Sequence, residues 1–524
     1  MRPSLLVLSI LISSNLLIGC SKKPEMAASA DYAAASADSA MFSEPTAAPT
    51  STARYQHNPE NQITSTNDQA ISTLSLDVDT GAYANVRRFI QQGQLPPTDA
   101  VRIEELLNYF PYSSPNSPAT DMPFAVDTEL GRAPWQPNHL LLKIGVKAME
   151  VDQANQPPAN LVFLVDVSGS MDEPHKLPLA QASLRLLVNQ LRPQDYVSLV
   201  VYAGRTAVEL ASTSAKNKAE ILAAINRLTA SGSTDGESAL RLAYDQAAAH
   251  HIEGGINRIV LMTDGDFNVG VTDTQQIIDM VSRARERGVS LSTFGFGTDN
   301  YQEVLMEQIA DVGNGNYSYI DSLEEAHKVF DRELAATFNT VAKDVKLQLE
   351  FNPEHIQAWR LIGYENRVLA EHDFQNDQVD AADVGAGKSV VALYELTPVG
   401  QAGASAQQRY QSKTPATTPD THRDELGFLK IRYKQPNGNR SIERSVPITM
   451  RPTTQPSADF QFAAAVAGFG QLLKHSNYRG NWSYAQSAQL AAQARGADPR
   501  GYRQDFVKLV ELAGTLAPSS ATPE

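Results

Sequence analysis

Three short segments of the chain carry oxygen-bearing side chains at spacings that suit a hard cation. In the first segment, "DVSGSM", Asp166, Ser168 and Ser170 occupy alternate positions. The second, "GSTDGESAL", contains Thr234, and the third, "LMTDG", contains Asp264. Carboxylate and hydroxyl oxygens are preferred ligands of Mg²⁺ and Mn²⁺, and Ca²⁺ accepts the same chemistry. The spacing therefore predicts a divalent-cation site, provided that the fold brings the three segments together.

The elements around these segments indicate a fold that would do so. An apolar strand is predicted directly before Asp166 and another before Asp264, and amphipathic helices separate the strands. Such alternation is typical of a doubly wound α/β domain with a mainly parallel sheet, in which ligands bind at the carboxyl ends of the strands. The predicted strands are Leu161–Val165, Tyr196–Tyr202, Arg258–Met262, Val289–Phe296 and the weaker Tyr317–Ile320.

An Asp-x-Ser-x-Ser pattern alone is also common at turns and helix N-termini. Taken together, however, the three segments resemble the metal-ion-dependent adhesion site of von Willebrand factor type A (VWA) domains in order and spacing. The resemblance implies a Rossmann-like fold in which Ser168, Ser170 and Thr234 reach the ion directly or nearly so. It also implies that Asp166 and Asp264 act largely through bound water, and that an acidic residue of a protein partner completes the coordination.

The flanking regions extend the resemblance to a family of bacterial VWA lipoproteins. The segments that carry it are "LDVDTGAYANVRRFIQQGQLPPTDAVRIEELLNYFPY" and, near the C-terminus, "FAAAVAGFGQLLK" and "GYRQDFVKLVELA". In the first of these, Asp79 and Thr80 are predicted to cap a helix. The expected organisation is a signal peptide (1–19), a lipid-anchored disordered tether (20–60), an N-terminal flanking region (61–157), the VWA domain (158–341), a β-rich region (342–452) and a C-terminal helical region (453–524).

The N-terminus predicts export and lipid anchoring. An apolar run from Leu5 to Gly19 is too short to span a bilayer and is typical of a signal peptide. Its end, "LIGC", resembles the bacterial lipobox, which implies that Cys20 becomes the lipid-modified first residue of the mature protein and carries acyl chains such as palmitate. The expected location is the cell envelope, at the outer membrane facing the periplasm if the cell has two membranes.

Strands predicted on both sides of the α/β domain are expected to pair with one another in a β-sandwich. Before the domain these are Phe124–Leu130 and His139–Val146; after it they are "DVKLQLEF", "SVVALYEL", "LGFLKIRY" and "IERSVPITM". From Ala458 onward the apolar residues recur at helical spacing. The fold class is therefore α/β, flanked by a β-sandwich-like region and a C-terminal helical segment.

Composition and missing motifs exclude several functions. The 524 residues carry a formal net charge of −15, which disfavours a nucleic-acid partner held by phosphate contacts. Cys20 is the single cysteine, so the chain has neither an internal disulfide nor a cysteine-based zinc site. The segment "AADVGAGKSV" lacks the first glycine of a phosphate-binding loop and precedes a strand. Neither H-E-x-x-H nor G-x-S-x-G occurs, so an enzyme is not expected.

Two functions remain. The first is an envelope-anchored, non-enzymatic protein that binds a carboxylate of a protein partner through the metal. The second is a structural or regulatory envelope component whose VWA domain is an assembly platform with a non-essential metal. The sequence does not identify the partner, the process or the oligomeric state.

Overall fold

The computed structural model describes residues 55–76, 78–113, 122–152, 156–232, 236–265, 274–297, 302–333, 336, 338–401, 422–436, 438–449 and 455–517. The predicted signal peptide, Cys20 and residues 20–54 of the predicted tether lie outside these residues. Thr234 lies outside them as well. Among the described residues, no helix is both long enough and apolar enough to cross a bilayer.

A six-stranded sheet forms the centre of the α/β domain, in the order β10-β9-β8-β5-β6-β7. All neighbouring pairs are parallel except β6 and β7, which form an antiparallel hairpin at the edge. The mainly parallel doubly wound sheet is thus confirmed. Its strands are β5 (Ala159–Asp166), β6 (Tyr196–Ala203), β7 (Arg205–Ser214), β8 (Ile256–Thr263), β9 (Ser290–Gly295) and β10 (Tyr317–Tyr319).

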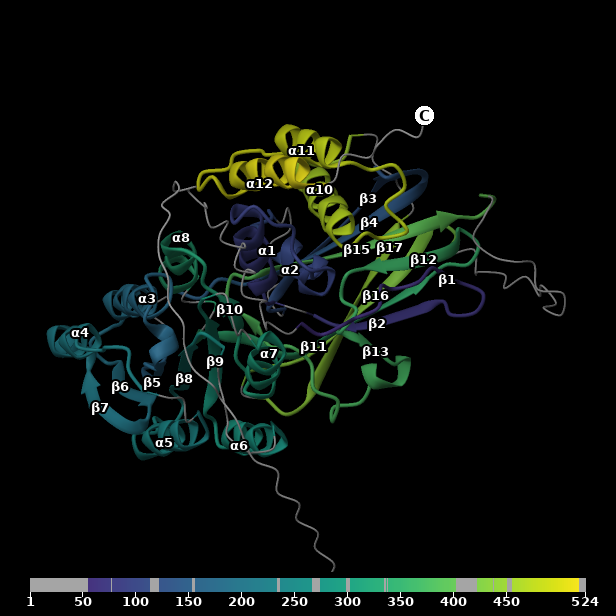
Figure 1. Ribbon diagram of the computed structural model, residues 1–524. Coiled ribbons are helices and arrows are strands. Elements are labelled where there is room, and N and C mark those ends of the chain that lie inside the picture. The colour runs from purple at the N-terminus through teal and green to yellow at the C-terminus, as the bar shows by residue number, and fades with distance from the viewer. Residues whose placement is uncertain are drawn as a thin grey trace, which may run out of the picture. The chain divides into compact units, whose positions relative to one another are not determined.

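Helices cover both faces of this sheet, as Figure 1 shows for α3 and α4 on one side and α5 and α6 on the other. Alternate residues of β5 divide between two buried clusters: Leu161 and Phe163 face α3, whereas Val162 and Leu164 face α5. Because both faces are covered, the central strands β5, β6 and β8 are mostly apolar and buried. The helices are α3 (Leu177–Gln190), α4 (Lys218–Asn226), α5 (Gly236–Ala249), α6 (Thr274–Glu286), α7 (Glu303–Val312) and α8 (Leu323–His327).

The strands on either side of the α/β domain pair with one another, as predicted, in two antiparallel sheets. One has the order β1-β12-β15-β4-β3 and the other β13-β2-β11-β16-β17, with β14 beside β11. Buried residues from both sheets form a single apolar core. The strands are β1 (Thr64–Ser65), β2 (Ile71–Ser75), β3 (Phe124–Ala133), β4 (Gln136–Ala148), β11 (Thr340–Phe351), β12 (Ile356–Ile362), β13 (Val368–Leu369), β14 (Val384–Gly385), β15 (Ser389–Pro398), β16 (Glu425–Lys434) and β17 (Ser441–Thr449).

A helical layer packs on the outer face of the first of these sheets. Its core joins apolar residues of the N-terminal and C-terminal helices to Trp135, Leu141 and Leu393 of the sheet region. Residues far apart in sequence thus form one cluster, in which Phe110 contacts Phe462 and Phe506 edge to face. The helices are α1 (Gly81–Gln91), α2 (Ile103–Asn108), α10 (Ala458–Leu473), α11 (Tyr484–Gln493) and α12 (Tyr502–Leu516).

The prediction that Asp79 caps a helix is wrong. Asp79 accepts a hydrogen bond from the backbone N–H of Tyr317 (3.1 Å) and lies 3.4 Å from the Arg367 guanidinium. Thr80 occupies the N-cap position of α1, but its side chain accepts no capping hydrogen bond. The Glu105 carboxylate instead accepts from the N–H of Ala82 (2.7 Å), so the first turn of α1 is capped from α2.

Residues 55–60, which the sequence analysis assigns to the tether, contact the folded body. The Asn85 side chain donates a hydrogen bond to the Tyr55 hydroxyl (3.0 Å), and Arg360 pairs with Glu60 (3.1 Å). The folded body therefore includes residues 55–60, because these polar contacts hold a segment that has few apolar residues of its own.

Candidate metal centre

The two aspartates of the predicted site lie on neighbouring strand ends. Asp166 is the last residue of β5, and Asp264 directly follows β8. Since β5 and β8 are adjacent and parallel, their carboxyl ends meet at one edge of the sheet. Both residues are buried, Asp166 with no exposed surface and Asp264 with 3%. The predicted convergence of the first and third segments is therefore observed.

Hydrogen bonds fix the orientation of the Asp166 carboxylate. One of its oxygens accepts from the N–H of Ser168 (2.9 Å), and the other accepts from the Thr263 hydroxyl (3.1 Å). The Thr263 hydroxyl in turn accepts from the N–H of Gly265 (3.1 Å). Thr263 thus links the ends of the two strands and positions Asp166.

The two serines of the motif lie side by side. Their hydroxyl oxygens are 2.9 Å apart, close enough to hydrogen-bond with each other and to bind one small cation together. Ser168 is buried and precedes a short 3₁₀ turn, Gly169–Met171, which brings Ser170 back over it. Ser170 itself is half-buried and Gly169 is exposed, so the site opens to solvent on this side.

The segment that precedes Thr234 contacts the serine loop. Gly169 donates a backbone hydrogen bond to the carbonyl of Gly232 (3.0 Å), and Ser231 donates one to that of Val167 (2.7 Å). Gly232 has a φ of +84°, and a Cβ there would lie 3.1 Å from the backbone of Ala203. The first residue of the second predicted segment, Gly232, and the residue before it therefore contact the serine loop.

A lysine that the sequence analysis did not identify completes the cluster. The Lys176 ammonium donates hydrogen bonds to the carbonyl of Ser170 (2.9 Å) and to the Asp264 carboxylate (3.2 Å). The side chains of Lys176 and Asp264 are each only 4% exposed. A lysine next to the N-terminus of a helix carries no local signal of this role, because only the fold brings it to Asp264.

Charge distinguishes the two aspartates. Asp264 is paired with Lys176, whereas no Lys, Arg or His of the described residues lies within 4.0 Å of the Asp166 carboxylate. Burial raises the pKa of Asp166 to about 6, although its hydrogen bonds to Ser168 and Thr263 oppose the rise. A buried carboxylate without a counter-ion is energetically costly, and a bound cation would relieve that cost.

The donors present fit a hard divalent ion. Asp166, Ser168, Ser170 and Asp264 offer hydroxyl and carboxylate oxygens, with no sulfur or imidazole among them. No group of three or more His, Cys, Asp or Glu side chains suited to a metal occurs among the described residues. That finding is compatible with this site, because half of these donors are serine hydroxyls.

The chain matches known proteins over most of its length. The family model of the von Willebrand factor type A domain matches residues 160–332. A further von Willebrand factor model matches residues 49–143, and that of the YfbK C-terminal region matches residues 336–516. The uncharacterized protein YfbK of Escherichia coli K12 is 50% identical over 469 residues, covering 88% of this chain and 81% of YfbK. The chain belongs to the YfbK family.

Two solved structures also resemble it. A von Willebrand factor type A protein from Catenulispora acidiphila is 17% identical, covers 76% of this chain and 91% of its own, and superposes with a TM-score of 0.41. Proximal thread matrix protein 1 of the mussel byssus, described with zinc in its adhesion-site motif, is 20% identical. It covers 36% of this chain and 46% of its own, with a TM-score of 0.29. The VWA domain of this YfbK-family chain rests on the family-model match to residues 160–332.

Proposed function

We propose that the protein is a non-enzymatic lipoprotein of the cell envelope whose VWA domain binds a protein partner through Mg²⁺ or Mn²⁺. Asp166, Ser168, Ser170 and Asp264 would hold the ion from the described part of the site. Thr234 would contribute the remaining hydroxyl. The partner would complete the coordination with an aspartate or glutamate side chain.

The observation that carries the proposal is the juxtaposition of these donors at one edge of the sheet. Two adjacent serine hydroxyls lie together with a buried carboxylate that has no counter-ion among the described residues, and the serine side of the cluster opens to solvent. Such an arrangement suits a cation that is held from one side by the protein and approached from the other by a ligand.

The charge of the site favours an acidic partner. Lys176 lies against Asp264 and Ser170, and its other carboxylate partner, Glu173 (3.6 Å), is partly exposed. A divalent cation bound beside Lys176 would therefore leave the buried part of the site, with its two aspartates, with an excess of positive charge. A carboxylate from a partner would offset that excess and bind the ion directly. One such contact in a water-excluded position can contribute a large part of the affinity of a small interface.

Attachment through Cys20 belongs to the same proposal. An acylated Cys20 would hold the protein at the membrane surface, since each buried CH₂ contributes about 0.8 kcal/mol. The proposed location is the outer membrane, facing the periplasm, in a cell with two membranes. This part rests on the N-terminal sequence alone.

A second candidate function is an envelope component whose VWA domain serves as an assembly platform, with a metal that steadies the loops. The observation that favours it is the Lys176–Asp264 pair, because an internal ammonium already neutralises part of the site. Under this alternative, chelation would lower thermal stability and leave associations unchanged.

The test is capture of envelope proteins by the immobilised chain in Mg²⁺ or Mn²⁺ and in EDTA. A partner retained with metal, released by EDTA and lost by both Asp166→Ala and Ser168→Ala is the expected result. Arg241→Ala, at an exposed position of α5, is the control and should retain the partner. A partner held equally by all variants and in EDTA would favour the platform function instead.

A further inference from the structure

A cavity of about 1100 Å³ lies outside the VWA domain proper, between the sandwich and the helical layer. Its walls come from the end of α2, from β3, β4 and the start of β15, from the start of α10 and from the loop between α11 and α12. Glu333, which follows the helical turn Lys328–Arg332, also lines it. The volume suits a small molecule or a short peptide end.

Most carboxylates on the wall are already engaged. Asp127 pairs with Lys143 (2.6 Å), and Glu129 accepts from the N–H and hydroxyl of Ser457 (both 2.6 Å). Asp459 pairs with Arg503 (2.6 Å). These acidic groups therefore have little capacity left to bind a cationic ligand.

Glu333 is engaged in the same way. Its carboxylate lies 2.6 Å from the Lys388 ammonium and 3.2 Å from that of Lys328. The two ammonium groups lower the pKa of Glu333 to about 2, against the effect of burial. Lys388 is thus committed to a partner within the protein.

Unlike Lys143 and Lys388, which also line the cavity and are paired with carboxylates, Lys147 on β4 has no such partner among the described residues. Its half-buried ammonium donates to the carbonyl of Gly387 (2.6 Å), and no carboxylate of the described residues lies within 4.0 Å of it. Burial lowers the pKa of Lys147, with the more distant Glu150 and Glu333 opposing the change. Two of its three N–H donors are available to a ligand.

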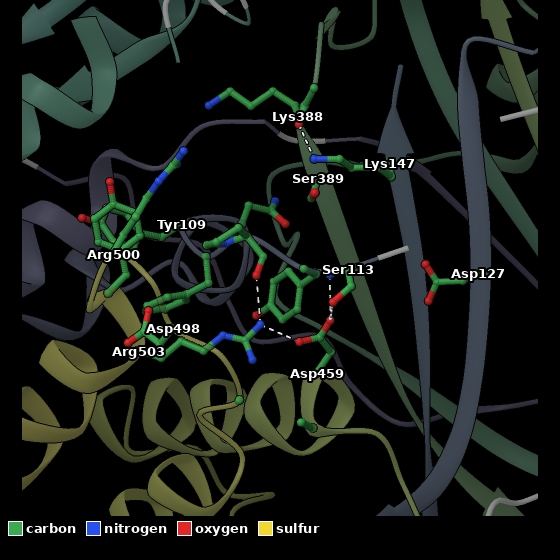
Figure 2. A pocket seen from close by; sticks show the side chains of 18 of the residues that line it. Tyr109, Ser113, Asp127, Lys147, Lys388, Ser389, Asp459, Asp498, Arg500 and Arg503 are labelled. Carbon is green, nitrogen blue, oxygen red and sulfur yellow. Dashed lines mark hydrogen bonds and ion pairs between the residues drawn. The ribbon is translucent and has the colours of Figure 1, made fainter. Parts of the chain in front are cut away.

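A second donor lies next to Lys147. Ser389 on β15 is its direct cross-strand neighbour, and Figure 2 shows both side chains at the same wall of the cavity. The Ser389 hydroxyl has no hydrogen-bond partner within the described part of the chain. The same holds for the hydroxyl of Tyr112, which is 6% exposed and also lines the cavity. Both hydroxyl oxygens have almost no exposed surface, so a group bound in the cavity would reach them after a side-chain rotation.

Arg500 adds positive charge at another wall. It lies in the exposed loop between α11 and α12, and Figure 2 shows it across the cavity from Asp127. Glu150, which is exposed, is the carboxylate that opposes Lys147 electrostatically. The cavity thus presents spare hydrogen-bond donors and cations, while most of its acceptors are occupied.

We propose that this cavity binds an oxyanion, a carboxylate or phosphate group of a small molecule or peptide end, at Lys147 and Ser389. The ammonium supplies charge-assisted hydrogen bonds, and the serine hydroxyl donates beside it. The site is independent of the metal centre and would be present whether or not the VWA domain holds an ion.

The test is ligand-detected NMR titration of the full chain with three probes. Inorganic phosphate tests a phosphate ligand, N-acetyl-trialanine tests a terminal carboxylate, and the amide of that peptide is the uncharged comparison. We expect phosphate or the acid peptide to bind, and the amide to bind at least roughly tenfold more weakly. Binding of phosphate alone would identify a phosphate-bearing ligand; binding of the acid peptide alone would identify a carboxylate.

Variants assign the binding to the cavity. Lys147→Met should weaken the bound probe roughly tenfold, and Ser389→Ala should weaken it less. Glu150→Gln should strengthen binding, which mere structural damage would not do. Lys508→Met on α12, at an exposed position paired with Asp505, is the control. Absence of binding by all probes, or equal binding by wild type and Lys147→Met, would overturn the proposal.

Discussion

At the scale of single residues, the candidate site combines the buried Asp166 and Asp264 and the hydroxyl of Ser168 with the buried ammonium of Lys176. Asp166, Ser168 and Asp264 could be predicted because each belongs to a local pattern at a strand end. Lys176 could not, because its role depends on a 3.2 Å contact with a residue 88 positions away. The candidate site therefore contains an internal cation that would compete with a bound metal ion for the Asp264 carboxylate.

Replacement of that lysine gives the first prediction. Lys176→Met removes a charge that repels the incoming ion and frees Asp264, so Mn²⁺ should bind about tenfold more tightly. Isothermal titration calorimetry measures this, with Lys216→Met at an exposed position of the same domain as the control. Unchanged or weaker Mn²⁺ binding by Lys176→Met would show that the lysine does not oppose the ion.

At the scale of elements, most of the longer strands were predicted, including strands that alternate apolar and polar residues, but β12 and β7 were missed. The β12 segment "IQAWRLI" was not predicted, since Arg360 interrupts it. In the fold Arg360 is buried and pairs with Glu395 (2.7 Å). The β7 strand was missed because it follows β6 after Gly204 alone and forms a partly exposed edge. Strands that are stabilised by ion pairs with distant residues, or that lie at a sheet edge, show little hydrophobic pattern in the local sequence.

A buried ionic contact between α2 and α7 gives a prediction for pH. Arg102 lies 3.6 Å from Glu303 and 2.5 Å from Glu307, and Glu303 has no exposed surface. Burial raises the pKa of Glu303 to about 7 from its ordinary 4.5, even with Arg102 nearby. The folded state therefore keeps a proton that the unfolded state releases, and wild type loses stability as pH rises from 4.5 to 7.

The Glu303→Gln variant has no titrating carboxyl at this position, so it should not lose this stability as the pH rises. Between pH 5 and pH 8, the stability of the variant should improve relative to wild type by about 2–3 kcal/mol. Urea unfolding at the two pH values measures the difference. A difference in unfolding free energy between variant and wild type that is the same at both pH values would contradict a raised pKa of Glu303.

At the scale of the whole molecule, the VWA domain is inserted between strands that pair with each other. The strand β4 before it and β15 after it are neighbours in one sheet. The apolar patterns predicted this pairing of strands. They could not predict the cavity or the contacts between the domain and the helical layer, because those join polar residues from distant segments.

One such contact links α1 to α8. The Arg87 guanidinium donates to Asp321 (2.7 Å) and Glu325 (2.8 Å), whose side chains are nearly fully buried. Arg87→Met leaves two buried carboxylates without their cation and should cost roughly 3–5 kcal/mol in urea unfolding. Arg241→Met, which breaks an exposed pair with Glu237, should cost less than about 1 kcal/mol. Similar losses of unfolding free energy in both variants would show that the buried Arg87 contact stabilises the fold no more than the exposed Arg241–Glu237 pair.

The metal centre is tested most directly by calorimetric titration of the wild-type protein with Mn²⁺, with the Ser168→Ala and Asp166→Asn variants titrated in parallel. Both substitutions keep the size of the residue close to the original while they remove a ligand or its charge. We expect one Mn²⁺ site in wild type, with affinity weakened at least about tenfold in each variant. No Mn²⁺ binding by wild type, or equal binding by all three proteins, would contradict a metal centre at the ends of β5 and β8.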